Sequence, residues 1–137
     1  MKVRDGMARI VHRARKTDKV GDIARTMKQE DIGFMPVVDG EVLIGVITDR
    51  DIVTSCIAEG HDPRGETAEH LMKREVTTIG PDEELEDAGR MMEREQIRRL
   101  PVVENGRLVG VLSHGNLVQA TKNKIAERAT EGVTRGA

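Results

Sequence analysis

The sequence has almost no aromatic side chains and a single cysteine. Its 137 residues include no Trp, no Tyr and one Phe. It therefore lacks the base-stacking platforms typical of proteins that bind single-stranded nucleic acid. Cys56 has no second cysteine to pair with, which excludes an intramolecular disulfide and fits a reducing compartment.

Long apolar runs and an excess of one charge are also missing. No stretch is long enough to span a bilayer, and the N-terminal sequence MKVRDGMARI has no apolar signal core. We therefore expect a cytoplasmic protein without membrane contact. The net charge is −2 and acidic and basic residues are interspersed, so the basic face that a DNA-binding surface needs is absent.

Signatures of catalysis and of metal binding are absent from the sequence as well. It has no phosphate-binding GxxxxGK[ST] loop and no pairing of a nucleophile with a base. The four His and one Cys show no spacing typical of metal ligands. The sequence therefore predicts neither an enzyme nor a metal site.

What the sequence does contain is one unit used twice. The stretch FMPVVDGEVLIGVITDRDIV is echoed by RLPVVENGRLVGVLSHGNLV, and the offset of 65 residues relates Pro36 to Pro101 and Gly45 to Gly110. The same offset relates Met7 to Met72 without a gap. A unit of this size buries only about 60% of its unfolded surface, so the two copies should share a core.

Each copy is predicted to fold as β-α-β-β-α, which makes the chain an α+β protein. A short strand at residues 10–12 leads to a helix capped by Thr17 or Asp18 and ending near Gly33. Asp39-Gly40 predicts a tight hairpin turn, as does Asn105-Gly106 in the second copy. The predicted organisation is a first repeat (1–60), a connector (61–68), a second repeat (69–129) and a flexible tail (130–137).

The repeated segments resemble the cystathionine-β-synthase (CBS) domain, and the pair resembles a tandem CBS module. The residues that carry the resemblance are DIGFMPVVDG and QIRRLPVVENG, followed by GVITDRD and GVLSHGN. The resemblance covers nearly the whole chain, which looks most like the small stand-alone prokaryotic members. It implies two repeats packed sheet to sheet about a pseudo-twofold axis, dimerisation, and clefts that bind AMP, ADP, ATP or S-adenosylmethionine.

The start of the helix after the hairpin is the first candidate site. Backbone N–H groups at a helix start favour phosphate, and the resemblance implies that Thr48 contacts phosphate and Asp51 the ribose. The alternative is that Thr48 is a plain N-cap and Asp51 an acid favoured by the helix dipole. The second copy has Ser113 and Asn116 instead, and an uncharged Asn should bind ribose more weakly.

Other candidate ligand contacts come from residues around the hairpin strands. Guanidinium groups suit phosphate oxygens, so Arg98 and Arg99 are candidate phosphate ligands or, alternatively, a solvated loop end. The resemblance implies an apolar adenine slot and a contact just after the first strand, for which the candidates are Met35, Pro36, Leu100, Pro101 and Thr17.

Three functions follow from this reading. The first is a regulatory module that binds an adenosyl ligand and acts on a protein partner. The second is a dimerisation or protein-interaction module that binds no ligand, a reading that Asn116 favours. The third, an enzyme, has no motif in its support.

Overall fold

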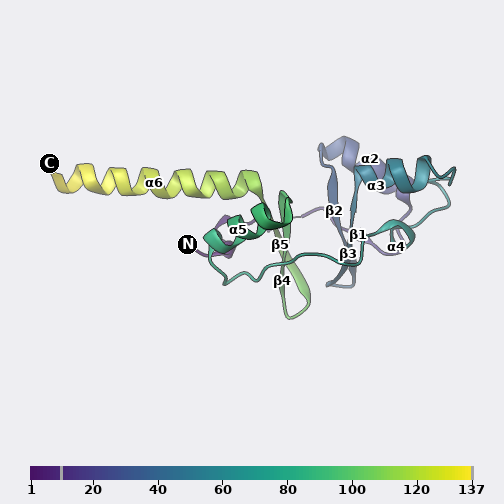
Figure 1. Ribbon diagram of the computed structural model, residues 1–137, viewed down its shortest axis with the longest axis horizontal. Helices are drawn as coiled ribbons and strands as arrows, with labels where there is room; N and C mark the ends of the chain where they lie inside the picture. The colour runs from purple at the N-terminus through teal and green to yellow at the C-terminus, as the bar shows by residue number, and fades with distance from the viewer. Residues whose placement is uncertain (10, 137) are drawn as a thin grey trace. The chain divides into compact units, whose positions relative to one another are not determined.

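The computed structural model describes residues 1–9 and 11–136, and the side chains of residues 1–9 and 11–132. The chain divides into two compact units, and each is described by itself. The α2 unit comprises residues 12–77 and 105–108, and the α5 unit comprises residues 1–11, 78–104 and 109–137. Each unit is named after its amphipathic helix, α2 or α5 (Figure 1).

The α2 unit follows the predicted β-α-β-β-α order. Strand β1 pairs in parallel with β2, and β2 pairs with β3 in antiparallel fashion across the Asp39-Gly40 turn. Val42 pairs with Arg107. The elements are β1 (Ala14–Arg15), α2 (Val20–Glu30), β2 (Phe34–Asp39), β3 (Val42–Thr48), α3 (Asp49–Asp51), the π-helix η1 (Ile52–Ile57) and α4 (Ala68–Leu71).

The core of the α2 unit lies under one face of α2. Val20, Ile23 and Met27 recur at helical spacing and are all buried. They pack with Val37 of β2 and Ile47 of β3, both fully buried. The apolar face of this helix is therefore the side that covers the sheet.

The predicted ends of this first helix were wrong. The N-cap residue is Lys19, because the carboxylate of Asp18 instead accepts the N–H of Arg15 at 2.9 Å. The helix ends at Glu30, and Asp31, not Gly33, takes the left-handed conformation with φ of 53°. A Cβ at Gly33 would lie 2.8 Å from a carboxylate oxygen of Asp49, a flexible side chain that can move aside.

The helical segment after β3 buries only part of its apolar side chains. Ile52 and Cys56 are buried, with 7% and 0% of their surface exposed. Val53 and Ile57, one position further along in each case, are 59% and 54% exposed. Their exposure leaves two large apolar side chains facing outward on η1.

The α5 unit repeats this arrangement. Ile79 forms a parallel bridge to Val102, at the positions that correspond to Ala14 and Val37 in the α2 unit. β4 and β5 are neighbouring strands joined by the Asn105-Gly106 turn. The elements are α1 (Val3–Gly6), α5 (Leu85–Glu95), β4 (Arg99–Glu104), β5 (Arg107–Ser113) and α6 (His114–Gly136).

Two sequence predictions concern the first strand and the C-terminal segment of the chain. The predicted strand at 10–12 includes residue 10, which lies outside the described residues, and the first strand is Ala14–Arg15. Helix α6 continues through the segment predicted as a tail, up to Gly136. Its yellow C-terminal half extends beyond the rest of the α5 unit (Figure 1). The flexibility of that segment stays a prediction, as do the repeat boundaries.

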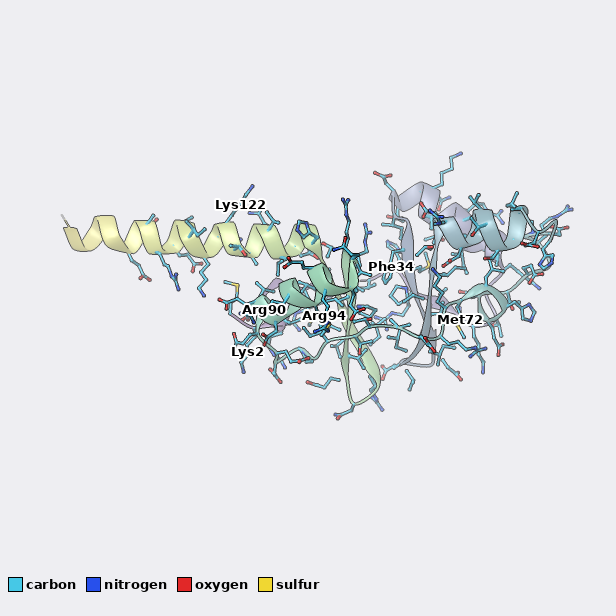
Figure 2. The ribbon with its side chains drawn as sticks, in the orientation of Figure 1. Lys2, Phe34, Met72, Arg90, Arg94 and Lys122 are labelled. Carbon is cyan, nitrogen blue, oxygen red and sulfur yellow. The ribbon has the colours of Figure 1, made fainter. Side chains whose placement is uncertain are left out.

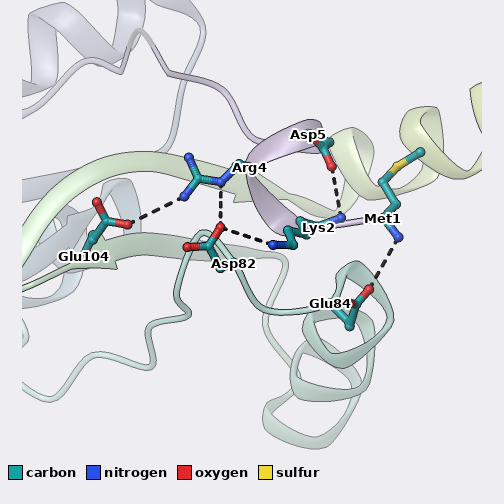
Figure 3. Close-up of polar contacts among 7 residues, drawn as sticks. All are labelled: Met1, Lys2, Arg4, Asp5, Asp82, Glu84 and Glu104. Carbon is teal, nitrogen blue, oxygen red and sulfur yellow. Dashed lines mark hydrogen bonds and ion pairs between the residues drawn. The ribbon is translucent and has the colours of Figure 1, made fainter.

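Charged contacts fasten α1 to the α5 unit (Figure 3). Arg4 Nε donates to Asp82 Oδ1 at 2.8 Å, and Arg4 also lies 3.7 Å from Glu104. Val3 N–H donates to Glu83 O at 2.9 Å. The hydrogen bond from Arg4 lowers the pKa of the Asp82 carboxyl, so this contact favours the ionised acid.

Candidate functional site

Each hairpin's second strand carries a glycine that another segment of the same unit covers. In the α2 unit a Cβ on Gly45 would lie 2.7 Å from both Lys73 O and Met72 Sδ. In the α5 unit a Cβ on Gly110 would lie 2.7 Å from Ala8 O and 2.8 Å from Met7 Sδ. A glycine without a side chain on a strand could let a ligand approach its backbone, but at Gly45 the chain itself occupies that space. Met72 is labelled in Figure 2.

Thr48 and Asp51 form a reciprocal cap at the start of α3. Asp51 N–H donates to Thr48 Oγ1 at 3.2 Å, and Thr48 N–H donates to Asp51 Oδ2 at 2.9 Å. This is the capping role weighed as the alternative to ligand binding. It leaves the Thr48 hydroxyl hydrogen free to donate, and it leaves the second carboxylate oxygen of Asp51 outside the cap.

That second oxygen faces a lysine that the sequence did not single out. Asp51 is 5% exposed, and its Oδ1 lies 3.4 Å from Lys73 Nζ. Lys73 follows α4 and has most of its side chain in solvent. The negative charge of the buried carboxylate is therefore balanced by an exposed ammonium group.

The second copy builds the same cap without charge. Asn116 N–H donates to Ser113 Oγ at 3.0 Å, and Ser113 N–H donates to Asn116 Oδ1 at 3.1 Å. The position that corresponds to Lys73 is Ala8. Both members of the charged pair are thus absent from this copy.

The start of α6 borders a cleft that gathers three of the predicted residues. Arg98, Arg99 and Ser113 line it together with His114 and Gly115, and its volume is about 270 Å³. His114 N–H donates to Arg98 O at 2.7 Å, which holds the loop before β4 against the helix. Neither arginine forms an ion pair within the described part of the chain. The cleft therefore presents two free guanidinium groups and a hydroxyl to solvent.

The corresponding positions of the α2 unit lack this basic character. Gly33 and Phe34 replace the two arginines, and Asp49 replaces His114. Asp49 N–H donates to Gly33 O at 3.0 Å, so the backbone contact is the same. An open cleft of about 440 Å³ on this side is lined by Asp49, Arg50, Val53 and Thr54.

The other residues predicted to contact the ligand lie at separate places in the structure. Met35 lines a cleft of about 200 Å³ with residues that include His12, Arg13 and Asp22. Thr17 is exposed in the turn after β1. Three more are buried in the cores of their units, namely Pro36, Leu100 and Pro101. Ligand contact by any of these residues stays a prediction.

Lys73 is a site residue that sequence reasoning missed, whereas His114 is interpreted from the sequence as a surface or cleft histidine and not as a metal ligand. Comparison of the copies at the fixed offset gives a signal for Lys73, because it corresponds to Ala8. Among the described residues, no group of three or more His, Cys, Asp or Glu is placed to hold a metal ion, and no helix is long and apolar enough to cross a membrane.

Comparison with known families now identifies the repeat. The CBS domain profile matches residues 3–57 and 68–123 of the chain. The chain belongs to the CBS domain family. It is 36% identical over 133 residues to the CBS domain-containing protein YhcV of Bacillus subtilis (strain 168), which covers 96% of this chain and 94% of that protein. The predicted family and the mixed α and β fold with two CBS repeats are confirmed.

Two solved CBS proteins carry bound adenosyl ligands. CBSX2 in complex with AMP has a TM-score of 0.78 and 28% identity, with 89% of this chain and 96% of that chain covered. The CBS domain pair of MJ0100, in complex with 5′-methylthioadenosine and S-adenosyl-L-methionine, has a TM-score of 0.76 and 25% identity, covering 88% and 99%. Adenosyl binding is therefore a property of similar CBS pairs.

Proposed function

We propose that this CBS pair is a cytoplasmic regulatory module that binds an adenosyl ligand and transmits its presence to a protein partner. The ligand is AMP, ADP, ATP or S-adenosylmethionine, and no catalysis is involved. The adenosyl ligands of CBSX2 and MJ0100 support this class of ligand. The observation that carries the proposal is the cleft at the start of α6, where Arg98, Arg99 and Ser113 meet.

The cleft has the groups that a ligand phosphate needs. Each guanidinium offers several N–H donors in a planar array that matches phosphate oxygens. Ser113 Oγ already accepts the N–H of Asn116, so its own hydrogen is available to donate. The N-terminus of the 23-residue helix α6 adds a favourable dipole.

In the α2 unit we assign the ribose to Asp51 and a phosphate contact to Thr48. The adenine contacts fall to Met35 and Pro36 there, and to Leu100 and Pro101 in the α5 unit, while Thr17 supplies a separate contact just after the first strand. Met35 is the best supported of these because it borders a cleft. Asn116 would hold ribose hydroxyls more weakly than a carboxylate does, so the two sites should differ in affinity.

Calorimetric titration with AMP, ADP, ATP and S-adenosylmethionine tests the proposal. We expect saturable binding of at least one of them, and weaker binding of AMP after Arg98→Gln combined with Arg99→Gln. Arg94→Gln is the matched control, because Arg94 is an exposed arginine on α5 that pairs with Glu95 at 3.2 Å (Figure 2). Absence of binding for all four ligands at millimolar concentration would refute the proposal that the protein binds an adenosyl ligand.

The partner surface that we propose is the outward face of η1, and the first partner is a second copy of the chain. Val53 and Ile57 are more than half exposed there, which is unusual for large apolar side chains placed one helical turn apart. The alternative function, an interaction module without a ligand, rests on the same surface and on Asn116. It predicts the same oligomeric state with and without AMP, together with an absence of binding heat.

A further inference from the structure

The charged pair of Asp51 and Lys73 is the least expected feature of the α2 unit. A buried carboxylate is costly unless its oxygens are paired. Oδ2 of Asp51 is held by the Thr48 N–H at 2.9 Å, and Oδ1 lies 3.4 Å from the Lys73 ammonium. The side chain of Asp51 is 7% exposed and that of Lys73 is 67% exposed.

The backbone of Lys73 is held in place, while most of its side chain is exposed to solvent. Its N–H donates to Val46 O at 2.9 Å, and its O accepts the Val46 N–H at 3.0 Å. The close approach to Gly45 fixes the same segment. Only the flexible four-carbon stem can move, so the ammonium stays within reach of Asp51 while its partner can change.

The α5 unit shows that this pair is not required for the backbone arrangement. Ala8, at the position of Lys73, makes the same two hydrogen bonds to Val111, at 2.9 and 3.0 Å. Asn116 there needs no counter-ion. The fold thus tolerates a neutral pair at the same place, and the charge in the α2 unit calls for another explanation.

We propose that Lys73 makes the α2-unit site selective for anionic adenosyl ligands over neutral ones. This inference rests on the proposed function, in which Asp51 accepts the ribose hydroxyls. The charged groups at the start of α3 are Asp49, Arg50 and Asp51, which together carry a net negative charge. Lys73 cancels that charge.

The ammonium changes its partner when the ligand binds. Once ribose hydroxyls occupy Oδ1, Lys73 turns to the anionic group of the same ligand. A neutral adenosyl ligand offers no such group, and it must also displace the ammonium from Asp51. AMP and 5′-methylthioadenosine share the adenosyl group and differ in charge, which makes them the matched probes.

The test compares the dissociation constants of these two ligands by calorimetry. All proteins carry Arg98→Gln and Arg99→Gln, so that binding in the α5-unit cleft does not mask the α2-unit site. We expect Lys73→Met to weaken AMP binding by about threefold to fivefold, the range for a partly screened charge at close distance, and to leave 5′-methylthioadenosine equal or tighter. Lys73→Arg should keep the preference for AMP.

Lys28→Met is the control, because Lys28 is an exposed lysine on α2 of the same unit and does not line the cleft that contains Met35. It should change neither constant. Equal changes for both ligands in Lys73→Met, or tighter AMP binding, would overturn the inference alone. A protein without these substitutions that binds neither ligand would overturn the proposed function as well. If Lys73→Met does not fold, the parent protein is tested instead: the ratio of the dissociation constant of 5′-methylthioadenosine to that of AMP must fall as salt is raised, and a constant ratio refutes the inference.

Discussion

Gly45→Ala is the substitution that most sharply tests how the α2 unit is packed. The new methyl carbon would lie 2.7 Å from the carbonyl oxygen of Lys73 and from the sulfur of Met72. The Met72 side chain can move aside, but the Lys73 oxygen belongs to the backbone and is held by the Val46 N–H at 3.0 Å. The segment after α4 must therefore withdraw from β3.

The cost follows from two contributions. Forcing an extra methyl group into a packed site costs about 1–3 kcal/mol. Loss of one hydrogen bond between Val46 and Lys73 adds about 1 kcal/mol. We therefore expect the free energy of unfolding to fall by about 2–4 kcal/mol, a large share of the total of a typical domain.

Urea unfolding followed by circular dichroism measures this change. Gly110→Ala should be destabilising to a similar extent, because Ala8 O lies 2.7 Å from the Cβ position there. Gly132→Ala is the matched control. Nothing lies within 4 Å of its Cβ position in α6, so the substitution should not lower the free energy of unfolding. A change of less than about 0.5 kcal/mol for Gly45→Ala would refute the packing argument.

Three further predictions concern the exposed surface of η1, the thiol of Cys56 and the loss of stability at low pH. Val53→Glu with Ile57→Glu should shift the protein from dimer to monomer in sedimentation velocity; an unchanged sedimentation coefficient would argue against η1 as the interface. Burial raises the pKa of the Cys56 thiol, so iodoacetamide should react slowly with native protein and rapidly with unfolded protein, which mass spectrometry can follow. Arg4 lowers the pKa of Asp82, so the pair stabilises the fold above about pH 4 and loses this effect as the pH falls further. The stability difference between the parent and Asp82→Asn should accordingly shrink in acid urea titrations, and a constant difference would contradict the assignment.

The sequence predicts the repeated unit well because its signals are local. The hairpin turns need positive φ, which Gly40, Asn105 and Gly106 adopt. The caps at Thr48 and Ser113 depend only on residues within one turn. The grouping of Arg98 with Ser113 follows because the loop before β4 meets the end of β5.

Other features depend on contacts between distant segments, which periodicity does not reveal. Met72 and Lys73 look like the lead-in to the second repeat, yet they pack on β3 of the α2 unit. The exposure of Val53 and Ile57 could not be read from an apolar spacing that fits burial equally well. The ion pair of Lys73 with Asp51 follows from the same distant packing.

The central claim is that this CBS pair binds an adenosyl ligand through the start of α6. Amide proton–nitrogen correlation spectra recorded during titration with AMP test it most directly. We predict saturable shifts of the amides of Ser113, His114 and Gly115 and of the Arg99 side chain. The shifts of the three amides should be smaller in the Arg98→Gln, Arg99→Gln protein. Spectra that remain unchanged at millimolar AMP, or shifts confined to residues away from this cleft and from Thr48 and Asp51, would contradict the account.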